Sequence, residues 1–163
     1  MTAPAVAAEL RVRAMVRPEL DLLLDWAAGE GWNPGLHDAA RFPAPRPAFL
    51  ASWISRPGVV ALCAVEGSRV VGLGVLRPCR EGRKVGPLLA LDATVAASLL
   101  DALSAAAPGE PVFLDVPESN PAALALARAR GMREVFGCAR MYLGPPPRLP
   151  GAEVFGVTSL ELG

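Results

Sequence analysis

A loop in the first third of the chain gathers the side chains best suited to bind a small molecule. The stretch GWNPGLHDAARFPAPRP, residues 31–47, is dense in Pro and Gly, which predicts a loop. It combines an aromatic, an amide and two titratable side chains: Trp32, Asn33, His37 and Asp38. Loops on a rigid scaffold often carry binding groups, so these residues form a candidate site. A structural turn, pinned by His37 and Asp38, is the alternative.

Two more titratable side chains stand close to predicted strands and could move a proton. Glu118 follows the apolar run PVFLDV by two residues, and Tyr142, the only tyrosine, lies in RMYLG. A carboxylate can act as a general base, and a phenol can donate a proton. Structural roles are the alternatives, because Glu118 could cap the helix beginning at Asn120 and Tyr142 could be a buried, hydrogen-bonded phenol.

The cysteines do not form a recognisable metal or disulfide pattern. Cys63, Cys79 and Cys138 are odd in number and widely spaced, and His37 is the only histidine. This spacing fits neither a disulfide framework nor a zinc site. We therefore expect reduced thiols in or near a core, and no metal.

Composition favours one globular domain. A chain of 163 residues, 52% of them apolar and 20% charged, is long enough for one sizeable core and too apolar for a disordered chain. Sixteen basic side chains balance sixteen acidic ones. A neutral chain has no long-range field to attract a polyphosphate, so nucleic acid is not expected as a partner.

The beginning of the chain and its apolar runs predict a cytoplasmic protein. The start MTAPAVAAELRVR has neither a basic region nor a long apolar region, and therefore does not resemble a secretion signal. Charged residues and prolines interrupt every apolar run before the roughly 20 residues that a membrane span requires. We expect no membrane partner.

Apolar periodicity and turn residues predict an alternating order of strands and helices. We expect strands at residues 10–15, 59–65, 69–76, 82–91, 111–116, 133–139 and 140–144, and helices at 18–31, 48–54, 92–107 and 120–130. This order predicts an α/β layered domain around one mixed sheet. Val112, Leu114 and Val116 are expected in a central strand, with at least two of the three side chains buried.

The predicted domain leaves two short terminal segments. We expect a flexible N-terminus at residues 1–9, a single domain at 10–145, and a proline-rich spacer with a C-terminal strand at 146–163. The run VFGVTSLEL, residues 154–162, is β-prone and too apolar for a free tail. We expect it to pair as an added strand, either on its own sheet or on a partner's sheet in a two-fold homodimer.

The stretch LDVPESNPAALALARARGM, residues 114–132, resembles the fifth strand and fourth helix of the GNAT superfamily of N-acetyltransferases. The matching positions are Leu114, Val116, Asn120, Ala123, Leu126 and Gly131. The resemblance extends in element order from about Leu10 to Gly144. It implies a GNAT-like fold, with a mixed, mostly antiparallel central sheet flanked by helices.

A closer resemblance is to bacterial chains that carry two such domains in tandem. DWAAGEGWNPGLHDAA is similar to the front of their first domain, whereas FPAPRPAFLASWI, GVLRPCREGRKVGPL and RMYLGPPP are similar to their second. The chain then corresponds to a front and a back joined near Ala40 and Arg41. It retains one complete fold.

The resemblance implies transfer of an acetyl group from acetyl-CoA to the amine of a small-molecule acceptor. In the family, the donor lies between the fourth and fifth strands, here residues 82–91 and 111–116, with its diphosphate at a helix N-terminus. Gly86-Pro87 is a plausible bulge in the first of these strands. The implied donor-binding residues are Leu88, Leu89, Ala90, Thr94, Val95, Ala96 and Asn120. Glu118 or His37 would be the base, Tyr142 the acid, and Trp32, Asn33 and Asp38 would contact the acceptor.

The chain departs from the family at two places. The family's diphosphate-binding pattern has Arg or Gln at its first position, Gly three residues later, and Gly or Ala two residues after that. In this chain the three positions hold Leu91, Thr94 and Ala96, so only the last one conforms. We also expect Asp92 to cap the helix by accepting the N–H of Thr94 or Val95, which would repel an anion there. Ala127 stands where the family often has a tyrosine acid. A second hypothesis is therefore a degenerate GNAT-like domain that has lost or replaced acyl-CoA, and acts as a binding or assembly module or as a scaffold for other chemistry.

Overall fold

The computed structural model describes residues 9–16, 19, 52–139, 141 and 151–159. The strands in these ranges are β1 (Leu10–Ala14), β2 (Val60–Glu66), β3 (Arg69–Pro78), β4 (Arg83–Ala90), β5 (Val112–Leu114) and β6 (Val154–Gly156). The helices are α3 (Ala93–Ala105), α4 (Pro121–Ala129) and the short 3-10 helix η1 (Gly151–Glu153). No helix in the described part of the chain is both long enough and apolar enough to span a membrane.

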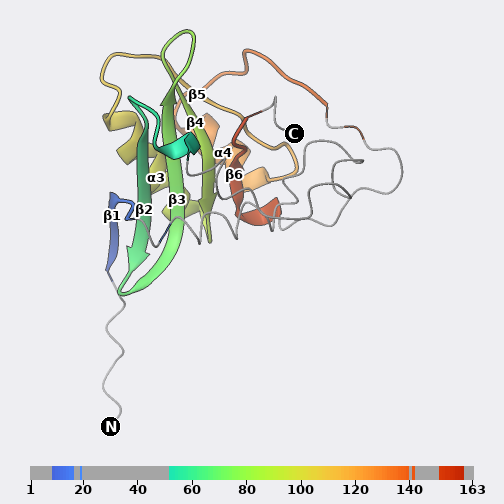
Figure 1. Cartoon of the computed structure of the whole chain (residues 1–163). Coiled ribbons are helices and arrows are strands. Elements are labelled where there is room, and N and C mark those ends of the chain that lie inside the picture. Colours follow the sequence, from blue (N-terminus) through green and yellow to red (C-terminus); the bar gives the residue numbers. More distant parts are fainter. Residues whose placement is uncertain (1–8, 17–18, 20–51, 140, 142–150, 160–163) are drawn as a thin grey trace, which may run out of the picture.

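The strands form one mixed sheet, shown in Figure 1. Its order is β1-β2-β3-β4-β5, and β6 also pairs with β4. The β4–β5 pair is parallel, and every other pair is antiparallel. The prediction of a GNAT-like, mostly antiparallel sheet flanked by helices is therefore confirmed.

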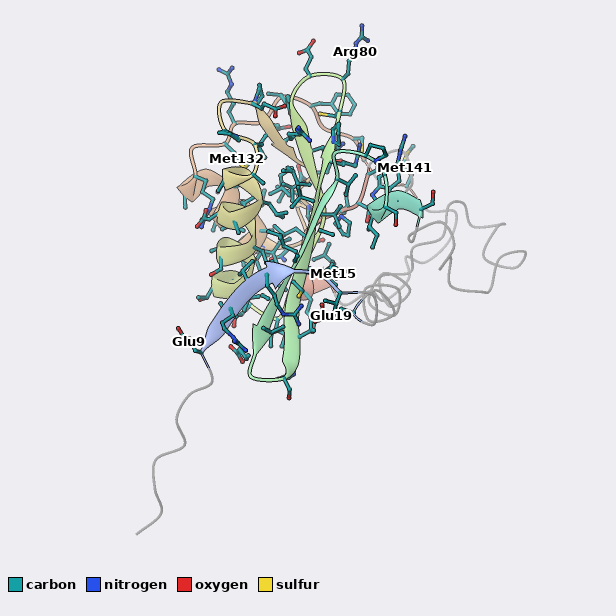
Figure 2. The ribbon with its side chains drawn as sticks, turned by 60° about the vertical axis from the view of Figure 1, so that its left-hand side comes forward. Glu9, Met15, Glu19, Arg80, Met132 and Met141 are labelled. Carbon is teal, nitrogen blue, oxygen red and sulfur yellow. The ribbon has the colours of Figure 1, made fainter. Side chains whose placement is uncertain are left out.

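Turn residues set the two hairpins. Gly67 has φ +60°, a left-handed conformation that glycine adopts without a steric penalty, and it connects β2 to β3 as the sequence predicted. The second hairpin connects β3 to β4, and Figure 2 shows Arg80 at its tip, pointing away from the molecule. These hairpins bring β2, β3 and β4 into adjacent positions and leave one edge of β4 for the strands that follow.

Helix α3 covers one face of the sheet because two glycines in β3 leave room for it. A Cβ atom at Gly72 would lie 2.5 Å from Val95 Cγ1, and one at Gly74 would lie 2.7 Å from Leu103 Cδ1. The buried residues of α3 are Val95, Ala96, Leu99, Leu100 and Leu103. Helix α4 is joined to α3 by a bidentate ion pair, in which Arg130 Nε and Nη2 donate to Asp101 Oδ1 (2.7 Å) and Oδ2 (2.8 Å).

The expectation of a buried central strand at Val112, Leu114 and Val116 was wrong. Strand β5 pairs with β4 as expected, but it ends at Leu114, and all three side chains are only half-buried. Within the described residues, β5 is the last strand on its path through the sheet. The physical reason is that residues 133–139, expected as the next strand, form none. Val135 and Phe136 are instead 67% and 72% exposed.

The C-terminal run pairs with its own sheet, which is one of the two arrangements expected from its sequence. Leu88 faces Gly156 and Leu89 faces Val154 across the β4–β6 pair. Phe155 is 1% exposed and is among the largest fully buried side chains. Figure 1 shows β6 on the β4–β5 side of the sheet, next to α4. The C-terminal strand is therefore part of the core.

Candidate active site

One edge of β4 is shared by two different strands. Strand β5 pairs with Arg83, Lys84 and Val85, whereas β6 pairs with Leu88 and Leu89. The change of partner falls at Gly86-Pro87, and the β3–β4 register shifts at the same point, where Gly74 faces Leu88 but Leu76 faces Val85. This extra residue in β4 confirms the expected bulge. We call the edge of β4 from Gly86 to Ala90, together with the residues after β5 and the first turn of α3, the β4–β5 site.

The C-terminal segment, residues 151–159, fills the space between β4 and the end of β5. Beyond its pairing with β4, the backbone N–H of Val157 donates to the carbonyl oxygen of Asp115, at 2.9 Å. A Cβ atom at Gly86 would lie 2.6 Å from the carbonyl oxygens of both Val157 and Thr158. The absence of a side chain at Gly86 therefore lets the two backbones touch.

Asn120 connects α4 to this segment. Its Oδ1 caps α4 by accepting the N–H groups of Ala122 (3.0 Å) and Ala123 (3.2 Å). Its Nδ2 donates to the carbonyl oxygens of Ala152 (3.1 Å) and Val154 (2.8 Å). The residue is 3% exposed, so both ends of a buried amide are satisfied within the chain.

Asp92 occupies the N-terminus of α3. Its Oδ1 accepts the N–H groups of Thr94 (2.8 Å) and Val95 (2.9 Å), and the N–H of Ala96 donates to its backbone oxygen (3.1 Å). The predicted cap is confirmed. The N–H groups that would otherwise bind an anion already have an acceptor, which is itself negatively charged.

The basic residues just upstream also have partners. Arg83 Nε lies 3.1 Å from Glu110 Oε2, and Arg83 Nη1 donates to the carbonyl oxygen of Gly58. Lys84 Nζ forms an ion pair with Asp115 Oδ2 across β4 and β5, and both side chains are mostly buried. This ion pair joins β4 to the residue after β5, next to the three residue pairs that hydrogen-bond the two strands.

The structure brings together only part of the set predicted from sequence. Leu88, Leu89 and Asn120 meet around the C-terminal segment, whereas Thr94, Val95 and Ala96 surround Asp92. Leu88, Leu89 and Ala90 are buried in β4, and Glu118 is exposed in the loop between β5 and α4. The remaining predicted residues lie outside the described part of the chain: Trp32, Asn33, His37, Asp38 and Tyr142.

Sequence reasoning missed the C-terminal segment as the occupant of this site. The available signal was the glycine in VFGVTSLEL, because a Cβ atom at Gly156 would lie 2.5 Å from Leu114 Cδ1 and 3.2 Å from Leu88 Cβ. A glycine inside a strand often marks a close approach of another backbone or ligand. Its contact partners could not be identified without the structure.

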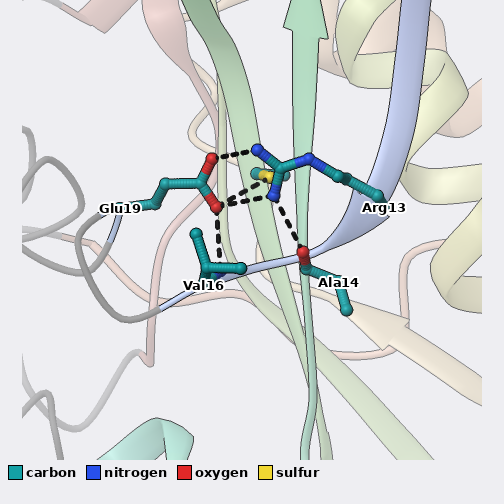
Figure 3. Close-up of polar contacts among 5 residues, drawn as sticks. Arg13, Ala14, Val16 and Glu19 are labelled. Carbon is teal, nitrogen blue, oxygen red and sulfur yellow. Dashed lines mark hydrogen bonds and ion pairs between the residues drawn. The ribbon is translucent and has the colours of Figure 1, made fainter.

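A second polar cluster, shown in Figure 3, joins β1 and β2 to the residues that follow β1. Arg13 Nη1 donates to Glu19 Oε2 at 2.9 Å, and its Nη2 pairs with Glu19 Oε1. Oε2 also accepts the backbone N–H of Val16 (2.8 Å) and the thiol of Cys63 (3.3 Å). The Arg13 hydrogen bonds lower the pKa of Glu19 to about 2, while burial and the Glu19 carboxylate raise the pKa of Cys63 to about 11. Neither group is suited to exchange protons near neutral pH.

Possible metal ligands are dispersed. Among the described residues, no group of three or more His, Cys, Asp or Glu side chains is placed to hold a metal ion.

The chain matches the family model described as an acetyltransferase (GNAT) domain over residues 36–156. It is 30% identical over 120 residues to holothin acyltransferase from Pseudoalteromonas sp. (strain SANK 73390). This alignment covers 73% of the chain but 41% of the relative. The chain thus spans less than half the length of this curated relative.

Solved structures share the fold. A proposed acetyltransferase from Pyrococcus horikoshii superposes with a TM-score of 0.63 at 23% identity, covering 96% of this chain and 46% of that one. The aminoglycoside acetyltransferase AAC(6')-Iy, solved with the bisubstrate analogue CoA-S-monomethyl-acetylneamine, superposes with a TM-score of 0.55 at 15% identity, covering 82% of this chain and 100% of that one. At these identities, the superpositions establish the fold alone.

Proposed function

Because the chain belongs to the GNAT acetyltransferase domain family, we propose that it transfers an acetyl group from acetyl-CoA to the amine of a small-molecule acceptor. The observation that carries this proposal is the family match over residues 36–156, which includes β4, β5 and both described α-helices. The holothin acyltransferase relative and the CoA-containing analogue bound to AAC(6')-Iy support the same class of reaction.

The proposal assigns roles to this chain's residues. The donor would lie along Leu88, Leu89 and Ala90, near the first turn of α3 and Asn120. Glu118 or His37 would accept the amine proton, and Tyr142 would supply a proton to the leaving group. The acceptor would contact Trp32, Asn33 and Asp38. The three free cysteines support a reducing compartment, and we propose the cytoplasm.

The residues of the β4–β5 site, as they are arranged, do not fit acyl-CoA. Strand β6 already pairs with the β4 edge, Asp92 already accepts the N–H groups of Thr94 and Val95, and Asn120 already binds the C-terminal segment. A diphosphate at the start of α3 would also face the Asp92 carboxylate. In this arrangement the donor has no free strand edge on β4 and no free N–H groups at Thr94 and Val95 to bind.

The same observations favour a second candidate function. A GNAT-like domain whose donor-binding groups are all satisfied internally could serve as a binding or assembly module, or as a scaffold for other chemistry. The Asp92 cap is the specific observation behind this candidate. Its carboxylate opposes diphosphate binding whether or not the C-terminal segment lies on β4.

Calorimetric titration with acetyl-CoA and free CoA, paired with an assay for release of the CoA thiol, separates the two candidates. Acyl transfer predicts binding and a thiol release that depends on an added primary amine. Saturation to about 100 times the dissociation constant should stabilise the fold by roughly 2.7 kcal/mol. The module function is favoured if neither the wild-type chain nor a Gly156→Ala variant that has released the C-terminal segment binds millimolar acetyl-CoA or produces free thiol.

A further inference from the structure

The C-terminal segment lies on the part of β4 that an acyl-CoA donor would need. We propose that this segment and acyl-CoA exclude each other from the β4–β5 site, so that the donor binds only to molecules in which the segment has moved away. This inference rests on the proposed function, because it describes how the donor site of that reaction is controlled.

The first observation is the hydrogen-bonding capacity of the strand edge. A strand presents one set of backbone donors and acceptors along each edge. Strand β3 pairs with one edge of β4, and on the other edge β5 pairs with Arg83–Val85 while β6 pairs with Leu88 and Leu89. An extended amide-containing ligand at Leu88 and Leu89 would therefore have to replace β6.

The second observation is the lack of space between the segment and the sheet. A Cβ atom added at Gly86 would clash with the backbone carbonyl oxygens of Val157 and Thr158, and one added at Gly156 would clash with the side chain of Leu114. Val154, Phe155 and Gly156 are all buried. Contact this close between backbones leaves no room for a chain of ligand atoms beside the segment.

The third observation is that Asn120 holds the segment from α4. Its Nδ2 donates to the carbonyl oxygens of Ala152 and Val154, and its Oδ1 separately caps α4. The backbone N–H of Val157 is held by Asp115 at the end of β5. The segment is thus bound by β4, by the residue after β5, and by α4, which are the elements that would surround the donor.

A substitution on the segment itself can displace it without changing the residues of β4, β5 or α4. Gly156→Ala places a methyl group 2.5 Å from Leu114 Cδ1 and 3.2 Å from Leu88 Cβ, so either the Leu114 side chain or the segment must shift, and amide exchange shows which one does. Gly151→Ala is the matched control, because the nearest atom to its new methyl group outside the adjoining residues, Ser119 Oγ, would lie at 3.8 Å, an ordinary contact. Both variants make the same chemical change in the same segment.

The experiment is calorimetric titration of CoA and acetyl-CoA into the wild-type chain and these two variants, with amide exchange reporting whether residues 151–159 are released. The apparent affinity of a ligand falls with the fraction of molecules that are competent to bind it, so Gly156→Ala should bind roughly tenfold or more tightly than wild type. Gly151→Ala should bind as wild type does. Equal affinity in all three chains, with residues 151–159 released in Gly156→Ala, would overturn the inference while leaving the acyltransferase proposal intact. A Gly156→Ala chain that releases the segment but binds neither ligand would overturn both.

A reversible cross-link provides the opposite test, and it decides the question if Gly156→Ala does not fold or keeps the segment in place. Leu89 and Val154 are direct partners across β4 and β6, and antiparallel partners lie within the Cα separation that a disulfide spans. In a Leu89→Cys/Val154→Cys chain, oxidation should lock the segment in place and abolish CoA binding, and a reductant should restore it. Glu66→Cys/Arg69→Cys, a partner pair at the β2–β3 hairpin, is the control and should bind CoA equally in both states. Unchanged CoA affinity on oxidation of the Leu89→Cys/Val154→Cys pair would overturn the inference.

Discussion

Single side chains in this protein often serve two elements at once. Asn120 caps α4 with its Oδ1 and holds the C-terminal segment with its Nδ2. Glu19 binds Arg13 of β1, the backbone of Val16 and the thiol of Cys63 in β2. Loss of either side chain would therefore loosen two elements, and the effect should be larger at Asn120, which is 3% exposed, than at the solvent-exposed ion pair of Glu19 with Arg13.

The Glu19 cluster predicts a specific dependence of stability on pH. Arg13 holds the pKa of Glu19 at about 2, below the value of roughly 4.3 expected in an unfolded chain. A lowered carboxyl pKa stabilises the fold above the unfolded pKa, and this contribution is lost as the pH falls through the folded pKa. The difference in free energy of unfolding between wild type and Glu19→Gln should therefore shrink as the pH falls from about 4.5 to about 2.

Denaturant titrations at several pH values measure this difference. Arg13→Gln is the matched control, because it removes the main cause of the lowered pKa of Glu19 and should flatten the same pH window. A difference between wild type and Glu19→Gln that stays constant from pH 5 to pH 2 would show that the ion pair does not contribute.

Substitutions of Asp92 can separate its contribution to the stability of α3 from its effect on anion binding. Asn is as good a helix cap as Asp but is uncharged, so Asp92→Asn should keep the stability of α3 and bind CoA more tightly than wild type. Asp92→Ala should also remove the like charge but cost about 1 kcal/mol of stability. Thermal melting and calorimetric titration of the two variants check both effects. Weaker CoA binding by Asp92→Asn would contradict a repulsive role for this carboxylate.

Among the elements, the C-terminal strand β6 contributes one large buried side chain to the core, that of Phe155. Phe155→Ala should cost about 3–5 kcal/mol, because Phe155 is 1% exposed and its removal leaves a cavity. Phe136→Ala is the matched control, since Phe136 is 72% exposed and should change stability by no more than about 0.5 kcal/mol. Chemical denaturation measures both changes. Equal effects of the two substitutions would argue that β6 is not part of the core.

Local signals in the sequence were sufficient for the hairpins and for α3 and α4. Gly67 and the caps Asp92 and Asn120 act over a few residues, so their sequence neighbours identify the elements they start or end. The burial of Val112, Leu114 and Val116 was not predictable in this way, because it depends on which strand lies beyond β5. For the same reason, sequence could suggest that residues 154–162 pair with a sheet but not that they pair with Leu88 and Leu89.

Two local features of the candidate site were predicted from the sequence, and its occupant was not. The Gly86-Pro87 bulge and the Asp92 cap were both confirmed, whereas the placement of the donor between β4 and β5 stays a prediction of the family resemblance. Occupation by the C-terminal segment depends on contacts between Gly86 and residues about 70 positions further along the chain. Such contacts between distant residues leave only weak local patterns, of which the glycine at position 156 is one.

The chain as a whole combines a GNAT sheet with a C-terminal segment that completes the core and pairs with Leu88 and Leu89 of β4. The family match and the solved structures establish the fold. The chain covers 41% of holothin acyltransferase and 46% of the Pyrococcus structure, so the activity of those longer proteins requires its own test here.

Hydrogen–deuterium exchange on the full chain, with and without saturating acetyl-CoA, tests most directly whether the donor and the C-terminal segment compete for one site. We predict that the amides of residues 151–159 lose protection in the complex, while those of β2 and β3 keep theirs. Saturation is established by calorimetry on the same sample, and Gly156→Ala is used to test binding alone if wild type binds too weakly. A saturated wild-type complex in which residues 151–159 keep their protection would contradict the competition, and so would the absence of any complex with either chain.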